Sequence, residues 1–496
     1  MSDVCLILEG TYPYVTGGVS SCVYQLIKNT PQIKYSILYI GASEIEGRDY
    51  KYPIPDNVSL IREVFLFDYN IQGRIFKLGN EFPSQLLTQF HREINSFDFS
   101  SLTKIFDYFF KDSEDFDKIL KIFQSQETWD YLVKSYNYRF SDQSQVSFID
   151  YFYTWRFTHY PVMRALSQEL PRAKLYHSLS TGYAGAMGVA AKLRYNRPFI
   201  LTEHGIYSHE REIEILQAEW IYNTDKEIKA MRHLSFFKEW WIHMFHFLSR
   251  MAYHFSDSIT TLNFGNRAKQ VQFGASFEKI KIIPNGIKIS DFEQIQFIPK
   301  NQREKYTIGL IGRVVPIKDI KTFLKAISIV VRNFRNIEVL IVGPWDEDEA
   351  YYQECLRLMN LLELENVVHF TGKMDVKKVY NKLDLLVLSS ISEGQPMVIL
   401  EAFACKIPVV ATDVGSCREL INGSDVDDRQ LGEAGRVVPF GMPEKLANAI
   451  LELLKDDELR LKMGQIARER VEKFYQEEIN IARYYQLYGQ YLGDQG

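Results

Sequence analysis

The sequence is most informative at residues 389–402, which read Ser-Ser-Ile-Ser-Glu-Gly-Gln-Pro-Met-Val-Ile-Leu-Glu-Ala. A largely apolar run at residues 383–388 precedes this stretch and has the length of a buried strand. After Gly394 comes Pro396, and residues 397–404 then form a good helix-forming run with proline near its first position. The pattern predicts a strand, a tight turn and a helix.

This turn has the features of an anion-binding site. Backbone N–H groups at a helix start lack intrahelical partners and lie at the positive end of the helix dipole. Glu393 precedes the predicted helix and Glu401 lies about two turns into it. A phosphate-binding helix start between two acids that accept hydroxyl hydrogen bonds suits a sugar nucleotide. The alternative is that Glu393 is an ordinary acid at a helix start and Glu401 is solvated.

Composition limits the class of protein. A chain of 496 residues is too long for one ordinary core, so two or more domains are expected. The hydrophobic content of 46% and the charged content of 24% are typical of a soluble globular protein. A net charge of −5 argues against general nucleic-acid binding, which needs a basic surface. The five scattered cysteines lack a CxxC spacing, which favours free thiols in a reducing compartment and no zinc site.

The chain shows no targeting or membrane-spanning pattern. Its first ten residues lack a basic segment and run directly into a strand pattern, so no signal peptide is expected. The aromatic segment 236–255 contains Lys238, Glu239 and Arg250, which argue against a transmembrane span. We therefore expect a cytoplasmic protein. The Trp240-Trp241 pair in this segment either packs a core or binds a partner.

The first half of the chain alternates apolar runs with turns and helix patterns, as a parallel sheet requires. Residues 4–8 precede a turn that contains Gly17 and Gly18, and further apolar runs end at residue 177 and at residue 202. His204 therefore follows a strand, at the edge where open α/β sheets bind ligands, although a structural histidine is the alternative. The charged residues from His209 onward are interpreted as a loop.

Residues 68–170 have a different character. Phe, Tyr, Asp and Lys dominate there, with helical spacing and no strand pattern. We interpret this stretch as a helical insertion into a first domain that covers residues 1–295. Its aromatic side chains either line an acceptor groove or pack its helices.

A second alternation follows a linker at about residues 294–305, where periodicity is lost. It predicts a doubly wound parallel sheet for a second domain at residues 305–475. Residues 476–496 are expected to form a helix that packs back on the first domain. The predicted fold class is α/β, with two Rossmann-like doubly wound domains that face a cleft.

Two cations follow the first strand of this second domain. Arg313 and Lys318 lie just past the predicted strand end, before a helix that opens at Asp319. Both can reach the turn at Gly394, where two cations and a helix start neutralise a diphosphate leaving group without a metal. The alternative is a pair of solvated loop cations, which becomes less attractive beside a second anion-type turn.

Other cofactor chemistries have weaker signals. The acidic runs at 346–348 and 425–428 have the Asp-x-Asp spacing of a Mn²⁺ site, but both lie in polar stretches and are interpreted as solvated loops. No Gly-x-Gly-x-x-Gly or Walker lysine loop follows a strand, and no Gly-x-Ser-x-Gly elbow is present. We therefore predict no metal and no other cofactor.

Several motifs occur together in an order that resembles a known family. They are Gly17-Gly18, Thr202-Glu-His204-Gly205, Ile283-Pro-Asn285-Gly286, Gly312-Arg313 with Lys318-Asp319, and Glu393-Gly394-x-Pro396 with Glu401. This set resembles the retaining family four of the GT-B glycosyltransferases, for which two glutamates separated by seven residues are a signature. The resemblance covers nearly the whole chain apart from residues 68–170. Residues 8–20, 177–185 and 202–207 are also similar to the members that build the Pel exopolysaccharide.

The resemblance implies roles for individual residues, of which His204, Glu393, Arg313 and Lys318 are the expected catalytic ones. The expected donor-binding residues are Gly17, Gly18, Asn285, Arg313, Lys318, Glu393, Gly394, Gln395, Pro396, Met397, Val398 and Glu401. Glu393 is expected to bind the donor hexose, Glu401 the ribose, and the two cations the diphosphate together with the backbone of Gly17 and Gly18. His204 is expected beside the transferred sugar. One departure is Gln395, which stands where many relatives have a bulky residue, so the sugar preference stays open.

The implied activity is metal-independent, retaining transfer of a hexose from a UDP-sugar to a growing Pel-type exopolysaccharide. The implied partners are a UDP-hexose or UDP-N-acetylhexosamine donor, a polysaccharide acceptor, and Pel synthase components at the inner face of the cell membrane. Two alternatives remain. The chain is a catalytically silent binding subunit of a polysaccharide synthase, against which the intact Glu393 and Lys318 argue, or it is a GT-B phosphorylase or epimerase.

Overall fold

The computed structural model describes residues 1–44, 48–68, 89, 93–94, 96–100, 102–110, 121, 123–140, 146–217, 236–295, 298 and 302–493. The chain forms two compact units. Unit 1 comprises residues 1–261, 267–281 and 485–496, and unit 2 comprises residues 262–266 and 282–484.

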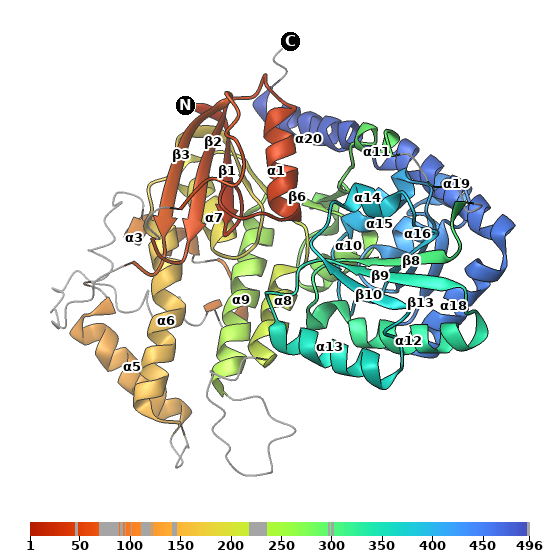
Figure 1. Cartoon of the computed structure of the whole chain (residues 1–496). Helices are drawn as coiled ribbons and strands as arrows, with labels where there is room; N and C mark the ends of the chain where they lie inside the picture. The colour runs from red at the N-terminus through yellow and green to blue at the C-terminus, as the bar shows by residue number, and fades with distance from the viewer. Residues whose placement is uncertain are drawn as a thin grey trace. The chain divides into compact units, whose positions relative to one another are not determined.

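Unit 1 is built on a seven-stranded sheet with the order β3-β2-β1-β4-β5-β6-β7 (Figure 1). The strands are β1 (Ser2–Glu9), β2 (Tyr35–Gly41), β3 (Val58–Phe65), β4 (Ala173–Ser178), β5 (Phe199–Glu203), β6 (Ser258–Thr261) and β7 (Ile280–Ile282). The pairs from β3 through β6 are parallel, with Val4 of β1 opposite Tyr35 on one side and Leu175 on the other. The centre of β1 is buried throughout, which explains its continuous apolar run.

The helices of unit 1 cover this sheet and extend beyond it. They are α1 (Gly18–Lys28), α3 (Leu102–Phe110), α5 (Gln126–Arg139), α6 (Phe148–Ser167), α7 (Tyr183–Tyr195), α8 (Tyr207–Gln217), α9 (Phe236–Phe255) and most of α10 (Phe264–Gln272). Helix α7 packs closely on the sheet at Gly188. A Cβ at this position would lie 2.1 Å from the ring of Phe199, so there is room only for glycine. Helices α6, α7 and α9 contact one another, and α5 contacts α6.

The predicted helical insertion is described in part. Within residues 68–170 the structure shows α3, α5 and α6, and most of the rest lies outside the described residues. The predicted loop at His209 is wrong, because these residues belong to α8. The backbone N–H of Tyr207 donates to the buried Glu203 carboxylate at 3.2 Å, which starts the helix, and Ile215 is buried.

Unit 2 contains a six-stranded sheet, all parallel, with the order β10-β9-β8-β11-β12-β13. Its strands are β8 (Tyr306–Ile311), β9 (Ile337–Val342), β10 (Val368–Gly372), β11 (Leu385–Leu388), β12 (Val409–Thr412) and β13 (Gly435–Val438). Its helices are α11 (Ser290–Glu293), η3 (Pro316–Lys318), α12 (Ile320–Asn333), α13 (Glu349–Leu361), α14 (Val376–Tyr380), α15 (Met397–Ala404), α16 (Cys417–Asn422), α17 (Val426–Arg429), α18 (Pro443–Lys455) and α19 (Asp457–Phe474). The two sheets confirm the predicted α/β class with two Rossmann-like units.

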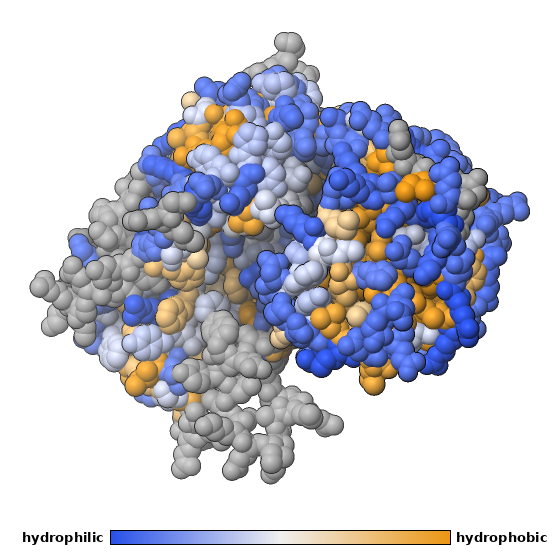
Figure 2. Space-filling model, in the orientation of Figure 1, coloured by the Kyte–Doolittle hydropathy of each residue, from blue (hydrophilic) through white to orange (hydrophobic). Residues whose placement is uncertain are grey.

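The sheet of unit 2 is covered on both faces. One hydrophobic cluster includes residues of α12, α13 and α18, and the other includes residues of α14, α15 and α16 (Figure 1). Figure 2 shows hydrophilic residues over much of the visible surface of α12, α13 and α18, with smaller apolar patches between them. This division is typical of helices that bury one stripe and expose the other.

The prediction that the acidic run 425–428 is a solvated loop is wrong, because Asp425 caps the short helix α17 and the residues after it belong to that helix. Asp428 is fully buried, and one carboxylate oxygen lies 2.5 Å from Nε of Arg470, whose side chain is also fully buried. Arg470 also donates to the backbone oxygen of Ile421 at 2.6 Å. The Asp428 carboxylate is therefore neutralised by Arg470 of α19 and is not hydrated as expected.

The last helix, α20 (Glu477–Leu492), contributes to both units, since residues from Tyr485 onward belong to unit 1. The hydroxyl group of Tyr488 is hydrogen-bonded to Nδ1 of His177 at 2.6 Å. Unit 2 resumes at Ile282, earlier than the linker expected at 294–305, and the domain limits stay a prediction.

Candidate functional site

Two residues predicted to act together form an ion pair in unit 2. Nζ of Lys318 lies 2.6 Å from Oε1 of Glu393, with side chains 18% and 11% exposed. Lys318 follows β8 and Glu393 follows β11, and these strands are neighbours in the parallel sheet. Both side chains therefore lie at the carboxyl ends of strands, where open α/β sheets bind ligands. The hydroxyl group of Ser390 donates to the same carboxylate oxygen at 2.6 Å.

The two loops that carry this pair are tied together. The hydroxyl group of Ser389 donates to the backbone oxygen of Lys318 at 2.8 Å, and the backbone N–H of Ile391 donates to the oxygen of Ile317 at 2.9 Å. These bonds join two loops more than seventy residues apart in sequence. The ion pair is therefore held by backbone as well as by its own attraction, which favours a preorganised site.

A third turn packs against the Glu393–Gly394 backbone. The N–H of Ser416 donates to the oxygen of Gly394 at 3.0 Å, and Gly415 has a φ of +53°. A Cβ at Gly415 would lie 2.1 Å from the oxygen of Glu393, so this position requires glycine for both conformation and space.

Helix α15 begins directly after this turn. It starts at Met397 behind Pro396, and no side chain caps its first turn. Met397 and Val398 are half-buried. The helix start predicted from the sequence is present, and anion binding by its first N–H groups stays a prediction.

Gln395 has a partner that the sequence did not reveal. Its side-chain oxygen accepts from the backbone N–H of Asn285 at 2.8 Å, and its amide nitrogen donates to the oxygen of Asn285 at 3.0 Å. Both residues are buried. The Gln395 side chain joins the loop after β7 to the turn before α15. It therefore stabilises the conformation of both segments. The donor-binding roles predicted for Asn285 and Gln395 stay predictions.

Arg313 lies beside a pocket that the sequence analysis missed. Its Nη1 lies 2.6 Å from both carboxylate oxygens of Glu347, and both side chains are about half exposed. The pocket has a volume of about 470 Å³ and is lined by Pro344, Trp345, Asp346, Glu347, Gly372 and Lys373. The sequence feature that could have indicated this pocket is Gly-Pro-Trp directly after β9, since the proline and the tryptophan both line the pocket.

Glu401 of α15 is partly buried and hydrogen-bonded to α14, so the alternative that it is simply solvated is wrong. Its Oε2 accepts from the hydroxyl group of Tyr380 at 2.7 Å. Burial raises the pKa of the Glu401 carboxyl group above its usual value. One of its oxygens accepts from Tyr380, and the ribose-binding role of Glu401 stays a prediction.

The remaining predicted residues belong to unit 1. His204 directly follows β5, and burial lowers its pKa to about 4, so its imidazole is neutral at pH 7. Gly17 and Gly18 begin α1 and are exposed, and no described heavy atom lies within 4 Å of a Cβ built on either. Joint action of these residues with those of unit 2 stays a prediction.

No group of three or more His, Cys, Asp or Glu side chains in the described part of the chain is arranged to hold a metal ion. Among the same residues, no helix is long and apolar enough to cross a bilayer.

Solved structures with a similar fold are glycosyltransferases and related synthases. HepE of Anabaena in complex with UDP has a TM-score of 0.60 at 14% identity, over 98% of this chain and 100% of that one. Sucrose-phosphate synthase of Thermosynechococcus elongatus has a TM-score of 0.58 at 17% identity, over 98% of each chain. Identities this low show the fold alone, which is the GT-B fold of two Rossmann-like domains.

Curated relatives match part of the chain. The capsular polysaccharide biosynthesis glycosyltransferase CapM of Staphylococcus aureus is 26% identical over 48% of this chain and 56% of its own length. The N-acetyl-alpha-D-glucosaminyl L-malate synthase of Bacillus anthracis is 31% identical over 39% of this chain and 48% of its own length. The chain thus spans about half the length of these relatives.

A family model for glycosyl transferases group 1 matches residues 291–470, which is most of unit 2. The matched part of the chain is therefore similar to group 1 glycosyl transferases, and the fold of the chain is GT-B. A second model, described as a domain of unknown function (DUF3492), matches residues 2–278, and the chain belongs to that family.

Proposed function

We propose that the chain is a metal-independent, retaining glycosyltransferase that moves a hexose from a UDP-sugar to a growing exopolysaccharide of the Pel type. The observation that carries this proposal is the Lys318–Glu393 ion pair beside the uncapped start of α15. It places a cation, a carboxylate and free N–H groups at one strand edge.

The chemistry needed is stabilisation of a departing diphosphate. Its charge grows as the bond to the sugar breaks, and Lys318 with the N–H groups of α15 are placed to neutralise it. Arg313, half exposed beside its pocket, adds a second cation. Glu393, already an acceptor for Lys318 and Ser390, is suited to accept hydroxyl groups of the sugar. In this proposal no metal is needed.

Retention is proposed to follow front-face attack, in which the departing phosphate takes the proton of the acceptor. No enzymic nucleophile is therefore assigned. His204 is neutral at pH 7 because of its lowered pKa, so it can exchange hydrogen bonds with the sugar without adding a charge.

UDP as the donor nucleotide and a polysaccharide as the acceptor are proposed from the similarity of this chain to other proteins. HepE has been solved with UDP and with UDP-glucose, and CapM is named for capsular polysaccharide biosynthesis. The quoted stretches at residues 8–20, 177–185 and 202–207 resemble PelF, the cytosolic glycosyltransferase of Pel synthesis. Association with Pel synthase components at the membrane belongs to the same proposal.

The test is release of UDP from a panel of UDP-glucose, UDP-galactose, UDP-N-acetylglucosamine and UDP-N-acetylgalactosamine in the presence of EDTA. We expect turnover of at least one donor and a higher melting temperature with UDP. Glu393→Ala should abolish turnover, while Glu354→Ala, which removes an exposed carboxylate of α13 paired with Lys321, should not.

Each part of the proposal has an outcome against it. A requirement for Mn²⁺ contradicts metal independence, and wild-type turnover in Glu393→Ala contradicts the assigned site. Binding of UDP without turnover of any donor favours the alternative of a catalytically silent binding subunit.

A further inference from the structure

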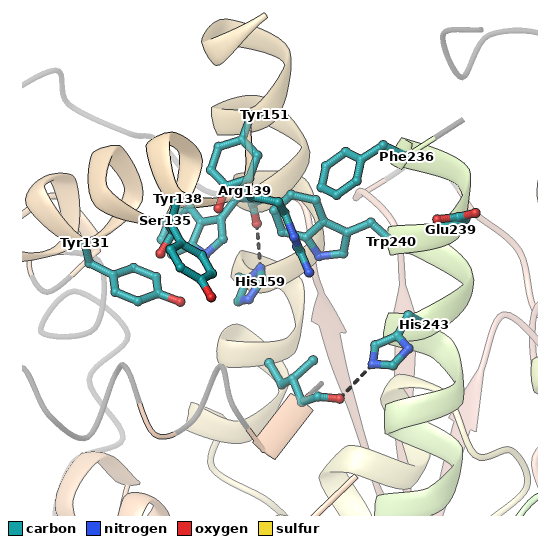
Figure 3. Close-up of a pocket in the computed structure, with 12 residues that line it drawn as sticks. Tyr131, Ser135, Tyr138, Arg139, Tyr151, His159, Phe236, Glu239, Trp240 and His243 are labelled. Carbon is teal, nitrogen blue, oxygen red and sulfur yellow. Dashed lines mark hydrogen bonds between the residues drawn. The ribbon is translucent and has the colours of Figure 1, made fainter. Parts of the chain in front are cut away.

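Unit 1 contains a cavity of about 440 Å³ among the helices of the insertion and α9 (Figure 3). Its volume lies within the range of about 300–1,000 Å³ that small-molecule sites occupy. Helix α5 contributes Tyr138 and Arg139, α6 contributes Tyr151 and His159, and α9 contributes Trp240. The cavity belongs to unit 1 alone and shares no residue with the site described above.

Each helix presents one face to this cavity. The lining residues of α9 are Phe236, Glu239, Trp240 and His243, which recur at the spacing of a single helical face. Those of α6 are Tyr151, Trp155 and His159, again one turn apart. Trp240 and Tyr151 face each other with ring centroids 5.2 Å apart. Figure 3 shows these rings and Arg139 gathered around a common space.

Several aromatic rings of the cavity are packed against each other before any ligand binds. Phe236 packs on Trp240 with centroids 5.4 Å apart, and Trp155 stacks on His159 at 5.0 Å. The guanidinium of Arg139 lies 5.3 Å from the ring centroid of Phe236. Rings that are already packed lose little conformational entropy when a ligand stacks on them.

The polar lining is mixed and mostly uncharged. Burial lowers the pKa of His159 to about 3 and also lowers that of His243, so both are neutral at pH 7. Nε2 of His243 donates to the backbone oxygen of Ile94 at 2.9 Å, which leaves its Nδ1 as an acceptor. One cation, Arg139, and one anion, Glu239, complete the lining. A phosphorylated ligand would be repelled by the Glu239 carboxylate. A lipid chain would leave the polar groups of the lining without hydrogen-bond partners.

We propose that this cavity binds a segment of neutral oligosaccharide. A sugar ring has an apolar face of C–H groups that stacks on aromatic rings and a rim of hydroxyl groups that pairs with Arg, Glu and neutral His. The wall of Tyr138, Tyr151 and Trp240 with the rim of Arg139, Glu239 and His243 matches both requirements. The further step, that this oligosaccharide is the acceptor chain, rests on the proposed function.

The experiment uses the full chain and two probes, the β-1,4-linked tetramer of N-acetylglucosamine and the α-1,4-linked tetramer of glucose. Calorimetric titration to about 10 mM, which detects a millimolar Kd, should show binding of at least one. Tyr138→Ala, at a side chain 91% exposed, and Arg139→Gln should each weaken that binding about tenfold. The control is Tyr485→Ala, which removes a tyrosine of the same unit that is 43% exposed on α20.

The outcomes separate the two proposals. Binding of neither tetramer to the wild type, or binding that Tyr138→Ala and Arg139→Gln both leave unchanged, overturns the cavity proposal. UDP-sugar turnover is measured on the same samples. Donor turnover without tetramer binding removes the cavity proposal alone, and tetramer binding without donor turnover removes the proposed enzymatic function alone.

Discussion

In unit 2, the guanidinium of Arg470 and the carboxylate of Asp428 are both fully buried and lie 2.5 Å apart. In unit 1, the buried carboxyl group of Glu203 instead meets uncharged donors, with the hydroxyl group of Tyr253 at 2.6 Å and the amide of Gln270 at 2.9 Å. Burial raises the pKa of Glu203, whereas Asp428 has a full positive charge beside it. The Asp428 carboxylate is thus paired with a charged group, whereas the Glu203 carboxyl group is paired with neutral ones.

The same difference holds at the strand ends. In unit 2 Lys318 and Glu393 form an ion pair, while in unit 1 the histidine that follows β5, His204, has its pKa lowered to about 4. A diphosphate needs fixed positive charge, whereas a sugar hydroxyl group is bound well by neutral donors and acceptors. The contrast between Lys318–Glu393 and His204 is consistent with the proposal that unit 2 binds the charged part of a donor.

The largest expected effect comes from breaking the buried pair of unit 2. Arg470→Met leaves Asp428 as an uncompensated buried charge, so the free energy of unfolding should fall by about 3–5 kcal/mol. Urea denaturation measures it. The control is Arg418→Met, which breaks an exposed pair with Asp413 and should cost less than about 1 kcal/mol. Equal losses in the two variants would show that burial of the Arg470 pair carries no extra energy.

The next effect is on donor turnover. Lys318→Met removes the cation beside Glu393 and the start of α15, so kcat/KM for the best UDP-sugar should fall about 100-fold. Lys321→Met removes a lysine whose partner, Glu354, is exposed, and it should keep wild-type turnover. A loss shared by both lysine variants would point to general surface charge instead of the pair at the strand edge.

A smaller effect is expected from the neutral link inside unit 2. Gln395→Met leaves the buried N–H and oxygen of Asn285 without the amide that binds them, at a cost of about 1–3 kcal/mol. Urea denaturation measures this loss. Gln353→Met, which removes an exposed bond to Glu349, is the control and should change stability little. A stable Gln395→Met variant with altered donor preference would instead place this side chain on the sugar.

Much of unit 2 could be predicted because its signals are local. The apolar run ending at Leu388 and the proline at 396 predict a strand and a helix start, and the strand-end rule brings Lys318 near Glu393. These inferences need only neighbouring residues and the topology of a parallel sheet.

The failures concern partners that are distant in sequence. Asp428 looked solvated because nothing near it indicates Arg470, and Gln395 gave no sign of Asn285, which lies 110 residues away. The acceptor groove offered as one of two uses for the aromatic residues of the insertion stays a prediction, since packing and ligand stacking need the same residue types. Tertiary contacts distinguish packing from ligand stacking. These contacts cannot be inferred from neighbouring residues in a single sequence.

The smallest effect tests whether unit 1 keeps its buried groups neutral. The folded pKa of His159 is lowered to about 3 by burial, below the unfolded value of about 6.5. Below pH 6.5 the unfolded chain therefore binds a proton that the folded chain does not, and the free energy of unfolding falls as the pH falls. Between pH 7 and pH 5 this one residue should cost the wild type about 2 kcal/mol.

His159→Gln removes this proton, so its stability should fall less steeply than that of the wild type between pH 7 and pH 5. Urea denaturation at pH 7, 6 and 5 measures the two slopes. Phe157→Leu, at a residue 48% exposed on the same helix, is the control and should keep the wild-type slope. If His159→Gln also keeps that slope, the imidazole is charged in the folded chain, and the neutral lining inferred for the cavity of unit 1 is wrong.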